Sequence, residues 1–123
     1  MLRVLVIDDE KIITGLLDKA LTGAGFDVEV ASNGYEGIER YNESCFDVVI
    51  TDGEMPYLNG NEVLNNIRQS SRPETPVIGM SGNPRFLSGH DFDVILPKPF
   101  SLKTLLSRLE QISYDVMLTL ETV

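Results

Sequence analysis

The chain opens with Leu2-Arg3-Val4-Leu5-Val6-Ile7-Asp8-Asp9, an aliphatic run of strand length that ends in two carboxylates. Behind it, apolar residues recur at i, i+3, i+4, i+7, i+8 and i+11, which marks one face of an α-helix. These residues are Ile13, Leu16, Leu17, Ala20, Leu21 and Ala24. Gly25 follows as a helix stop. The opening stretch is therefore typical of a strand followed by a helical crossover.

The same alternation continues to the end of the chain. Further strands are predicted at Val28–Ala31, Val48–Thr51, Pro76–Met80 and Asp93–Leu96, with helices starting near Gly34, near Asn59 or Gly60, and at Ser101 as N-cap. Near-continuous aliphatic strands with helical crossovers indicate a parallel sheet covered on both faces. Right-handed crossovers make this an α/β fold with a doubly wound, five-stranded, flavodoxin-like sheet. We expect one domain over residues 1–123, with residues 114–123 as a helix extension or tail.

Composition limits the function classes. The chain has 123 residues, of which 42% are hydrophobic and 24% charged, and its formal net charge is −9. This acidity would repel phosphate backbones, so direct nucleic-acid binding is not expected. No apolar run reaches the ~18 residues of a membrane span, so we expect a cytoplasmic protein without a membrane partner. The single cysteine, Cys45, excludes an internal disulfide and is expected to be a small core residue.

Chemistry-bearing residues stand where the predicted strands end. Asp8 and Asp9 end the first strand, Asp52 the third and Ser81 the fourth, while Lys98 follows the fifth. In doubly wound sheets, functional residues gather beyond the carboxyl ends of the strands. Each feature alone also occurs in ordinary turns, but their coincidence in this order favours one pocket.

Such a pocket suits phosphoryl transfer. Two carboxylates ~4 Å apart repel by up to roughly 4 kcal/mol at an effective dielectric near 20, and a hard cation such as Mg²⁺ relieves that repulsion. An aspartate carboxylate is a competent nucleophile toward phosphorus. Lys98 would add positive charge, and the Ser81 hydroxyl could hydrogen-bond a phosphoryl oxygen.

With these residues the chain resembles a known family, the receiver domain of two-component response regulators, over nearly its whole length. The motifs that carry the resemblance are Val4–Glu10, Val48–Asp52, Gly53–Gly60 with its Met-Pro and Asn-Gly pairs, Ser81-Gly82 and Leu96–Phe100. In the last of these motifs the family usually has a cis Lys-Pro bond, which here would be Lys98–Pro99.

The resemblance implies a role for each residue. Asp52 would accept phosphate from a phosphohistidine on a sensor histidine kinase or a histidine phosphotransfer protein. Asp9 and Asp52 would ligate Mg²⁺ (or Mn²⁺) directly, Asp8 largely through water, and Glu54 through its backbone carbonyl. Ser81 and Lys98 would bind the phosphoryl group and carry the signal outward. The only chemistry implied is on the protein itself, so it would not be an enzyme, and it would be a monomer or weak dimer.

Three departures from the family pattern stand out. Ile95 occupies a position where family members usually carry Tyr or Phe, so the usual ring switch cannot operate. The span from Ser81 to Lys98 is shorter than usual, which predicts a helix of one or two turns, or irregular structure, with Asn83 as cap and Pro84 at N1. Glu54 adds a carboxylate beside the site, with an effect whose sign the sequence does not fix.

Two other functions remain open. The first is a degenerate receiver that binds partners without phosphorylation, which Ile95 and the short connection suggest. The second is an enzyme of the same layered class, either a flavin protein or an aspartyl-phosphate hydrolase. The Asp8-Asp9-Glu10 run opposes both, because it would repel a flavin phosphate and lacks the Asp-x-Asp pattern of the hydrolases. Among the remaining residues, Tyr35 and Tyr41 are expected to pack, and His90 and Tyr57 to be exposed.

Overall fold

Five parallel strands form a single sheet at the centre of the molecule. The structure is a computed structural model and describes residues 2–121. The strands are β1 (Arg3–Ile7), β2 (Asp27–Ala31), β3 (Val48–Asp52), β4 (Val77–Ser81) and β5 (Val94–Pro97). Their order across the sheet is β2-β1-β3-β4-β5, and every neighbouring pair is parallel. The predicted five-stranded, doubly wound sheet is confirmed.

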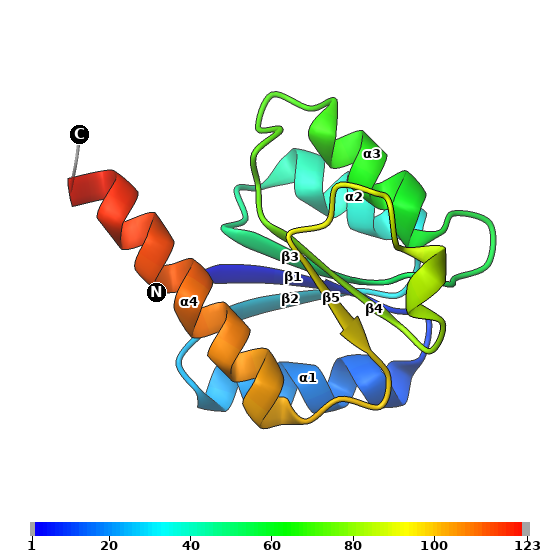
Figure 1. Ribbon diagram of the computed structural model, residues 1–123, viewed down its shortest axis with the longest axis horizontal. Helices are drawn as coiled ribbons and strands as arrows, with labels where there is room; N and C mark the ends of the chain where they lie inside the picture. Colours follow the sequence, from blue (N-terminus) through cyan, green and yellow to red (C-terminus); the bar gives the residue numbers. More distant parts are fainter. Residues whose placement is uncertain (1, 122–123) are drawn as a thin grey trace.

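Helices cover both faces of the sheet (Figure 1). The α-helices within residues 2–121 are α1 (Lys11–Gly23), α2 (Gly34–Glu43), α3 (Gly60–Arg68) and α4 (Leu102–Glu121). In Figure 1, α1 and α4 lie below the sheet and α2 and α3 lie above it. No helix within residues 2–121 is both long and apolar enough to cross a membrane.

The strands feed two separate cores, one on each face. Along β1, Val4 and Val6 join the core shared with α1 and α4, whereas Leu5 and Ile7 join the core shared with α2 and α3. All four side chains are fully buried. This arrangement explains why the strands read as continuous aliphatic runs, since a parallel strand covered on both faces has no solvent side.

The helix ends follow the signals in the sequence. Gly25, with φ +98°, follows the end of α1, as the predicted stop requires. Asn59 caps α3 in a capping box with Glu62. The Ser101 hydroxyl accepts from the Thr104 N–H at the start of α4.

The connection between β4 and β5 is short, as predicted. It contains only a three-residue 3-10 helix, η1 (Pro84–Phe86). The Asn83 side chain makes no capping hydrogen bond there, so its predicted role as a side-chain cap was wrong. Arg68 of α3 fastens this connection by ion pairs with Asp91 and Asp93. Tertiary contacts therefore hold a segment that has little secondary structure of its own.

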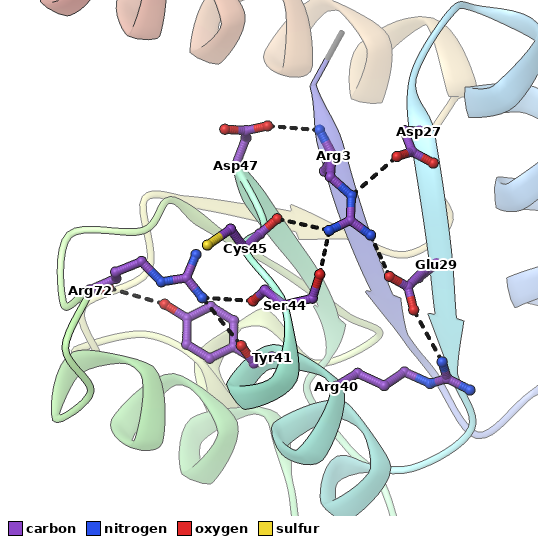
Figure 2. Close-up of polar contacts among 9 residues, drawn as sticks. All are labelled: Arg3, Asp27, Glu29, Arg40, Tyr41, Ser44, Cys45, Asp47 and Arg72. Atoms are coloured by element: carbon purple, nitrogen blue, oxygen red, sulfur yellow. Dashed lines mark hydrogen bonds and ion pairs between the residues drawn. The ribbon is translucent and has the colours of Figure 1, made fainter.

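Two arginines organise the amino-terminal edge of the sheet (Figure 2). Arg3 pairs with Asp27 and Glu29 of β2 and also donates to Ser44 and to the Cys45 carbonyl. From the other side, Arg72 donates to the backbone carbonyls of Tyr41 and Ser44. Hydrogen bonds from Arg3 and Arg72 thus hold the loop between α2 and β3 at the amino-terminal ends of the strands, opposite the predicted site.

Two predictions about packing were wrong. Cys45 is exposed, because its neighbour Phe46 fills the core position and the α2–β3 loop turns Cys45 outward. Tyr35 is 63% exposed, whereas Tyr41 is buried and its hydroxyl bonds to Thr75. Tyr57 and His90 are exposed, as expected.

The tail continues α4 as a helix through Glu121. Val116 packs against the core, but Tyr114, Met117 and Leu118 are exposed. In Figure 1 the last turns of α4 extend beyond the sheet. Residues 114–121 are thus helical, and residues 122–123 of the predicted tail lie outside the described part of the chain.

Candidate functional site

Three carboxylates meet at the carboxyl edge of the sheet. β1 and β3 are direct neighbours, with Ile7 in register with Thr51, so the residues that follow these strands emerge side by side. One carboxylate oxygen each from Asp8, Asp9 and Asp52 lies within 4.8 Å of the others. The structure thus brings together the three acidic residues that were predicted to line one pocket.

The backbone holds these carboxylates in place. Asp8 Oδ1 accepts from the Glu10 N–H at 3.0 Å, and the Asp52 carboxylate accepts from the Glu54 N–H. The start of α3 presses against the end of β3, where a Cβ added at Gly60 would lie 2.6 Å from the Asp52 carbonyl oxygen. Only glycine permits this approach, which explains the Asn59-Gly60 pair in structural terms.

Lys98 reaches the acidic cluster from the opposite side. Its backbone N–H donates to the Ser81 carbonyl at 2.8 Å, which ties the end of β5 to that of β4. Its ammonium lies 3.2 Å from Asp52 Oδ1 and 3.4 Å from Asp8 Oδ2. The Lys98–Pro99 peptide bond is cis, as the resemblance implied.

The site carries uncompensated negative charge. Burial raises the pKa of Asp8 from 3.8 to about 6, and repulsion from Asp52 adds to this rise although the Glu10 N–H and Lys98 oppose it. Burial also raises the pKa of Asp52 against the opposing influence of Lys98. For Lys98, burial acts to lower the pKa, but the charges of Asp8 and Asp52 outweigh it and raise the pKa overall. One lysine therefore does not balance three carboxylates.

This donor set fits a hard divalent cation. Carboxylate oxygens are the ligands that Mg²⁺ and Mn²⁺ prefer, and a bound cation would stabilise the charged forms of Asp8 and Asp52, whose pKa values burial raises. The raised pKa values show that burial, with repulsion between the carboxylates as a smaller cause, disfavours the negative charges of Asp8 and Asp52. Asp9, the exposed member, faces solvent at the mouth of this cluster.

Ser81 ends β4 beside this cluster and is fully buried. Its hydroxyl donates to Glu54 Oε1 at 2.6 Å and accepts from the Asn83 N–H at 2.9 Å. Ser81 was predicted to lie at the site and Glu54 to add a carboxylate beside it, but their direct contact was not predicted. The only signal was the position of Glu54 two residues after Asp52, and spacing alone does not show where a flexible side chain points.

Ile95, the residue that replaces the expected aromatic ring, is half-buried on β5 in register with Gly79. Leu87 from the β4–β5 connection is fully buried, and it lies against the positions of Gly53 and Gly79. The ring of Phe92 also lies against the position of Gly79, so an aliphatic and an aromatic side chain both pack at the β4 partner of Ile95.

Comparison with known proteins yields a family match and many structural neighbours. The model of the response regulator receiver domain matches residues 4–110. A transcriptional regulatory protein CpxR homolog of Haemophilus influenzae is 37% identical over 122 residues, which cover 91% of this chain and 50% of that protein. The transcriptional regulatory protein TrcR of Mycobacterium tuberculosis is 34% identical over 113 residues, covering 88% of this chain and 44% of that protein. The chain thus spans about half the length of these curated relatives.

Solved structures agree with this match. A response regulator receiver domain protein from Clostridium thermocellum superposes with a TM-score of 0.88 at 29% identity, over 97% of this chain and 99% of the other. The response regulator TrrA of Thermotoga maritima, in complex with Mg²⁺-BeF, superposes with a TM-score of 0.84 at 30% identity, over 91% and 99% of the two chains. The chemotaxis protein CheY4 of Vibrio cholerae has the same TM-score and identity, over 91% and 98%.

Proposed function

The chain belongs to the response regulator receiver domain family, and from this premise we propose that Asp52 accepts a phosphoryl group from a phosphohistidine of a partner protein. The observation that carries the proposal is the convergence of Asp8, Asp9 and Asp52 on one point, with the Lys98 ammonium 3.2 Å from Asp52. A turn or a packing role would require none of this arrangement, which concentrates negative charge at a cost in free energy.

The proposed reaction is a displacement at phosphorus. An Asp52 carboxylate oxygen forms a bond to phosphorus while the phosphorus–nitrogen bond to the donor imidazole breaks and its electron pair leaves with the ring. Lys98, already facing Asp52, offsets negative charge on the phosphoryl oxygens, and the Ser81 hydroxyl donates a hydrogen bond to one of them. Mg²⁺ or Mn²⁺, held by Asp8, Asp9, Asp52 and the Glu54 backbone carbonyl, would supply further charge neutralisation.

The proposed output is a change of conformer populations. A phosphoryl group on Asp52 shifts the protein toward a second state by no more than its difference in free energy between the two states. The proposed donors are a sensor histidine kinase or a histidine phosphotransfer protein, and the chemistry is confined to the domain itself. The names of the two relatives describe transcriptional regulation, so our sequence-based exclusion of nucleic acid as a partner receives no support.

A degenerate receiver that binds partners without phosphorylation is the second candidate. It is favoured by Ile95 in place of the aromatic ring and by η1 in place of a full helix. These features would affect how phosphorylation changes the conformation, not the phosphorylation reaction itself. The residues proposed for that reaction, the acidic cluster and Lys98, are all present. The second candidate therefore predicts a protein that is unchanged by phosphoryl donors.

Incubation with acetyl phosphate and Mg²⁺, followed by intact mass measurement, separates the two candidates. The unmodified protein should gain one phosphoryl group, and Asp52→Ala should gain none. Asp18→Ala is the matched control, since Asp18 lies on α1 and its carboxylate accepts a hydrogen bond from Thr22 of the same helix. The same gain in Asp52→Ala, or no gain in the unmodified protein, would refute Asp52 as the acceptor.

A further inference from the structure

The single proton of the Ser81 hydroxyl is already engaged in this structure. A serine hydroxyl has a single proton to donate, and it can accept through its lone pairs. Ser81 donates that proton to Glu54 Oε1 at 2.6 Å and accepts from the Asn83 N–H at 2.9 Å. A hydrogen bond from Ser81 to any other acceptor therefore requires that the bond to Glu54 break first.

Glu54 is placed to couple the acceptor to this hydroxyl. Its backbone N–H donates to the Asp52 carboxylate, while its side chain spans from the loop after β3 to the end of β4. Glu54 as a residue is exposed, whereas Ser81 is fully buried. The carboxylate can thus move into water at little cost in solvation, but the hydroxyl cannot, and only the Glu54 side can open.

We propose that Glu54 is a positioning residue that holds the Ser81 hydroxyl in the unphosphorylated protein and competes with the phosphoryl group for its proton. The inference rests on the proposed function, because the competing acceptor is a phosphoryl oxygen on Asp52. Glu54 thereby weakens phosphoryl binding and favours the unphosphorylated conformer. Its side chain returns to solvent when Ser81 turns to the new acceptor.

Simple repulsion between the Glu54 carboxylate and an anion would also weaken phosphoryl binding. The two explanations differ in their dependence on Ser81. Competition for a proton disappears when the hydroxyl is removed, whereas repulsion between charges does not. A double-mutant cycle over Glu54 and Ser81 therefore distinguishes them.

The first experiment is a titration with beryllofluoride, a phosphoryl mimic, at saturating Mg²⁺. Glu54→Ala should tighten binding by about threefold to tenfold, the size expected when one competing hydrogen bond is lost. In the Ser81→Ala background, the same substitution should change binding less than about twofold. Glu54→Gln, which keeps an uncharged acceptor, should fall between the unmodified protein and Glu54→Ala.

Glu10→Ala is the matched control for charge. Glu10 is an exposed carboxylate next to Asp9, and its side chain has no contact with Ser81. It should leave the beryllofluoride affinity of the protein within about twofold. Equal tightening by Glu54→Ala with and without the Ser81 hydroxyl, or no tightening at all, would overturn the proposal.

A second measurement tests the contact without any phosphoryl mimic. In the NMR spectrum of the free protein, Glu54→Ala should shift the Asn83 amide resonance, because the hydroxyl that accepts from this N–H loses its own acceptor. Glu10→Ala should leave that resonance in place. An unmoved Asn83 resonance in Glu54→Ala overturns the Glu54–Ser81 contact itself. A shifted resonance in a protein that never binds beryllofluoride keeps the contact but refutes the proposed function and the competition that rests on it.

Discussion

At the scale of single residues, Asp8 is the clearest case of a site residue whose buried charge destabilises the folded protein. It is 1% exposed, and burial raises its pKa from 3.8 to about 6. A carboxyl with a higher pKa in the folded state binds its proton more tightly there than in the unfolded state. The stability that protonated Asp8 contributes is therefore lost as the pH rises from about 4 to about 6. At neutral pH the ionised Asp8 carboxylate destabilises the metal-free protein.

Asp8→Asn should accordingly raise the free energy of unfolding of the metal-free protein at neutral pH. We expect a gain of about 1–2 kcal/mol, because the amide removes the buried charge while Asn can still accept from the Glu10 N–H. Lys98 keeps Asp52 as its partner. Urea unfolding with a chelator present, repeated from pH 4 to pH 8, measures the effect. A gain of the same size below about pH 4 as at neutral pH would contradict this assignment.

At the scale of elements, glycine in two helices serves opposite purposes. In α1, nothing lies within 4 Å of a Cβ added at Gly15, and the residue is exposed. In α2, a Cβ at Gly37 would lie 2.8 Å from Ile7 Cγ1, and Ile7 is fully buried. Gly37 thus sets how closely α2 approaches β1, whereas Gly15 only weakens its helix.

Alanine at these two positions should therefore act with opposite sign. Gly15→Ala should raise the free energy of unfolding by about 0.5–1 kcal/mol through helix propensity. Gly37→Ala should lower it by about 1–3 kcal/mol, because the buried Ile7 side chain must shift in a packed core. Chemical denaturation of both variants checks the pair, and stabilisation by Gly37→Ala would show that the α2–β1 packing is looser than the structure indicates.

The same elements show how far sequence reasoning reaches. Strand bounds and helix starts were predicted to within about two residues, because aliphatic runs and i, i+3, i+4 periodicity report burial directly. Tyr35 was misplaced because the buried face of α2 includes Gly34 and Gly37, which a search for apolar side chains does not count. Cys45 was misplaced because its orientation depends on Arg3 and Arg72, which are distant in sequence.

The site divides in the same way. The residues at the strand ends were predictable, since parallel topology alone brings Asp8, Asp52 and Lys98 to one edge. The contact between Glu54 and Ser81 was not, because it depends on the rotamer of an exposed side chain. Sequence therefore locates which residues can meet, and the structure decides which hydrogen bonds they make.

At the scale of the whole molecule, charge is distributed unevenly between the two edges of the sheet. The chain carries 19 acidic and 10 basic residues. Arg3 and Arg72 lie near the amino-terminal ends of the strands, where Arg3 pairs with Asp27 and Glu29 and Arg72 donates to the Ser44 carbonyl (Figure 2). At the carboxyl edge, Lys98 alone contacts the carboxylates Asp8 and Asp52 among the ion pairs within residues 2–121. The ion pairs of Arg3 and the proposed metal site thus lie at opposite ends of the strands.

This separation predicts two distinct responses to salt. Sodium chloride should raise the free energy of unfolding modestly, since it screens the self-repulsion of a chain with net charge −9. Magnesium chloride at matched ionic strength should raise it further, by about 1.4 kcal/mol when free Mg²⁺ is about ten times its dissociation constant. The further increment comes from binding at Asp9 and its neighbours and should vanish in Asp9→Asn, whereas Asp18→Asn should retain it. Thermal or urea unfolding in the two salts measures both responses. If magnesium and sodium stabilise the unmodified protein equally at matched ionic strength, the acidic cluster does not bind Mg²⁺ selectively. A metal site would then not account for the convergence of Asp8, Asp9 and Asp52.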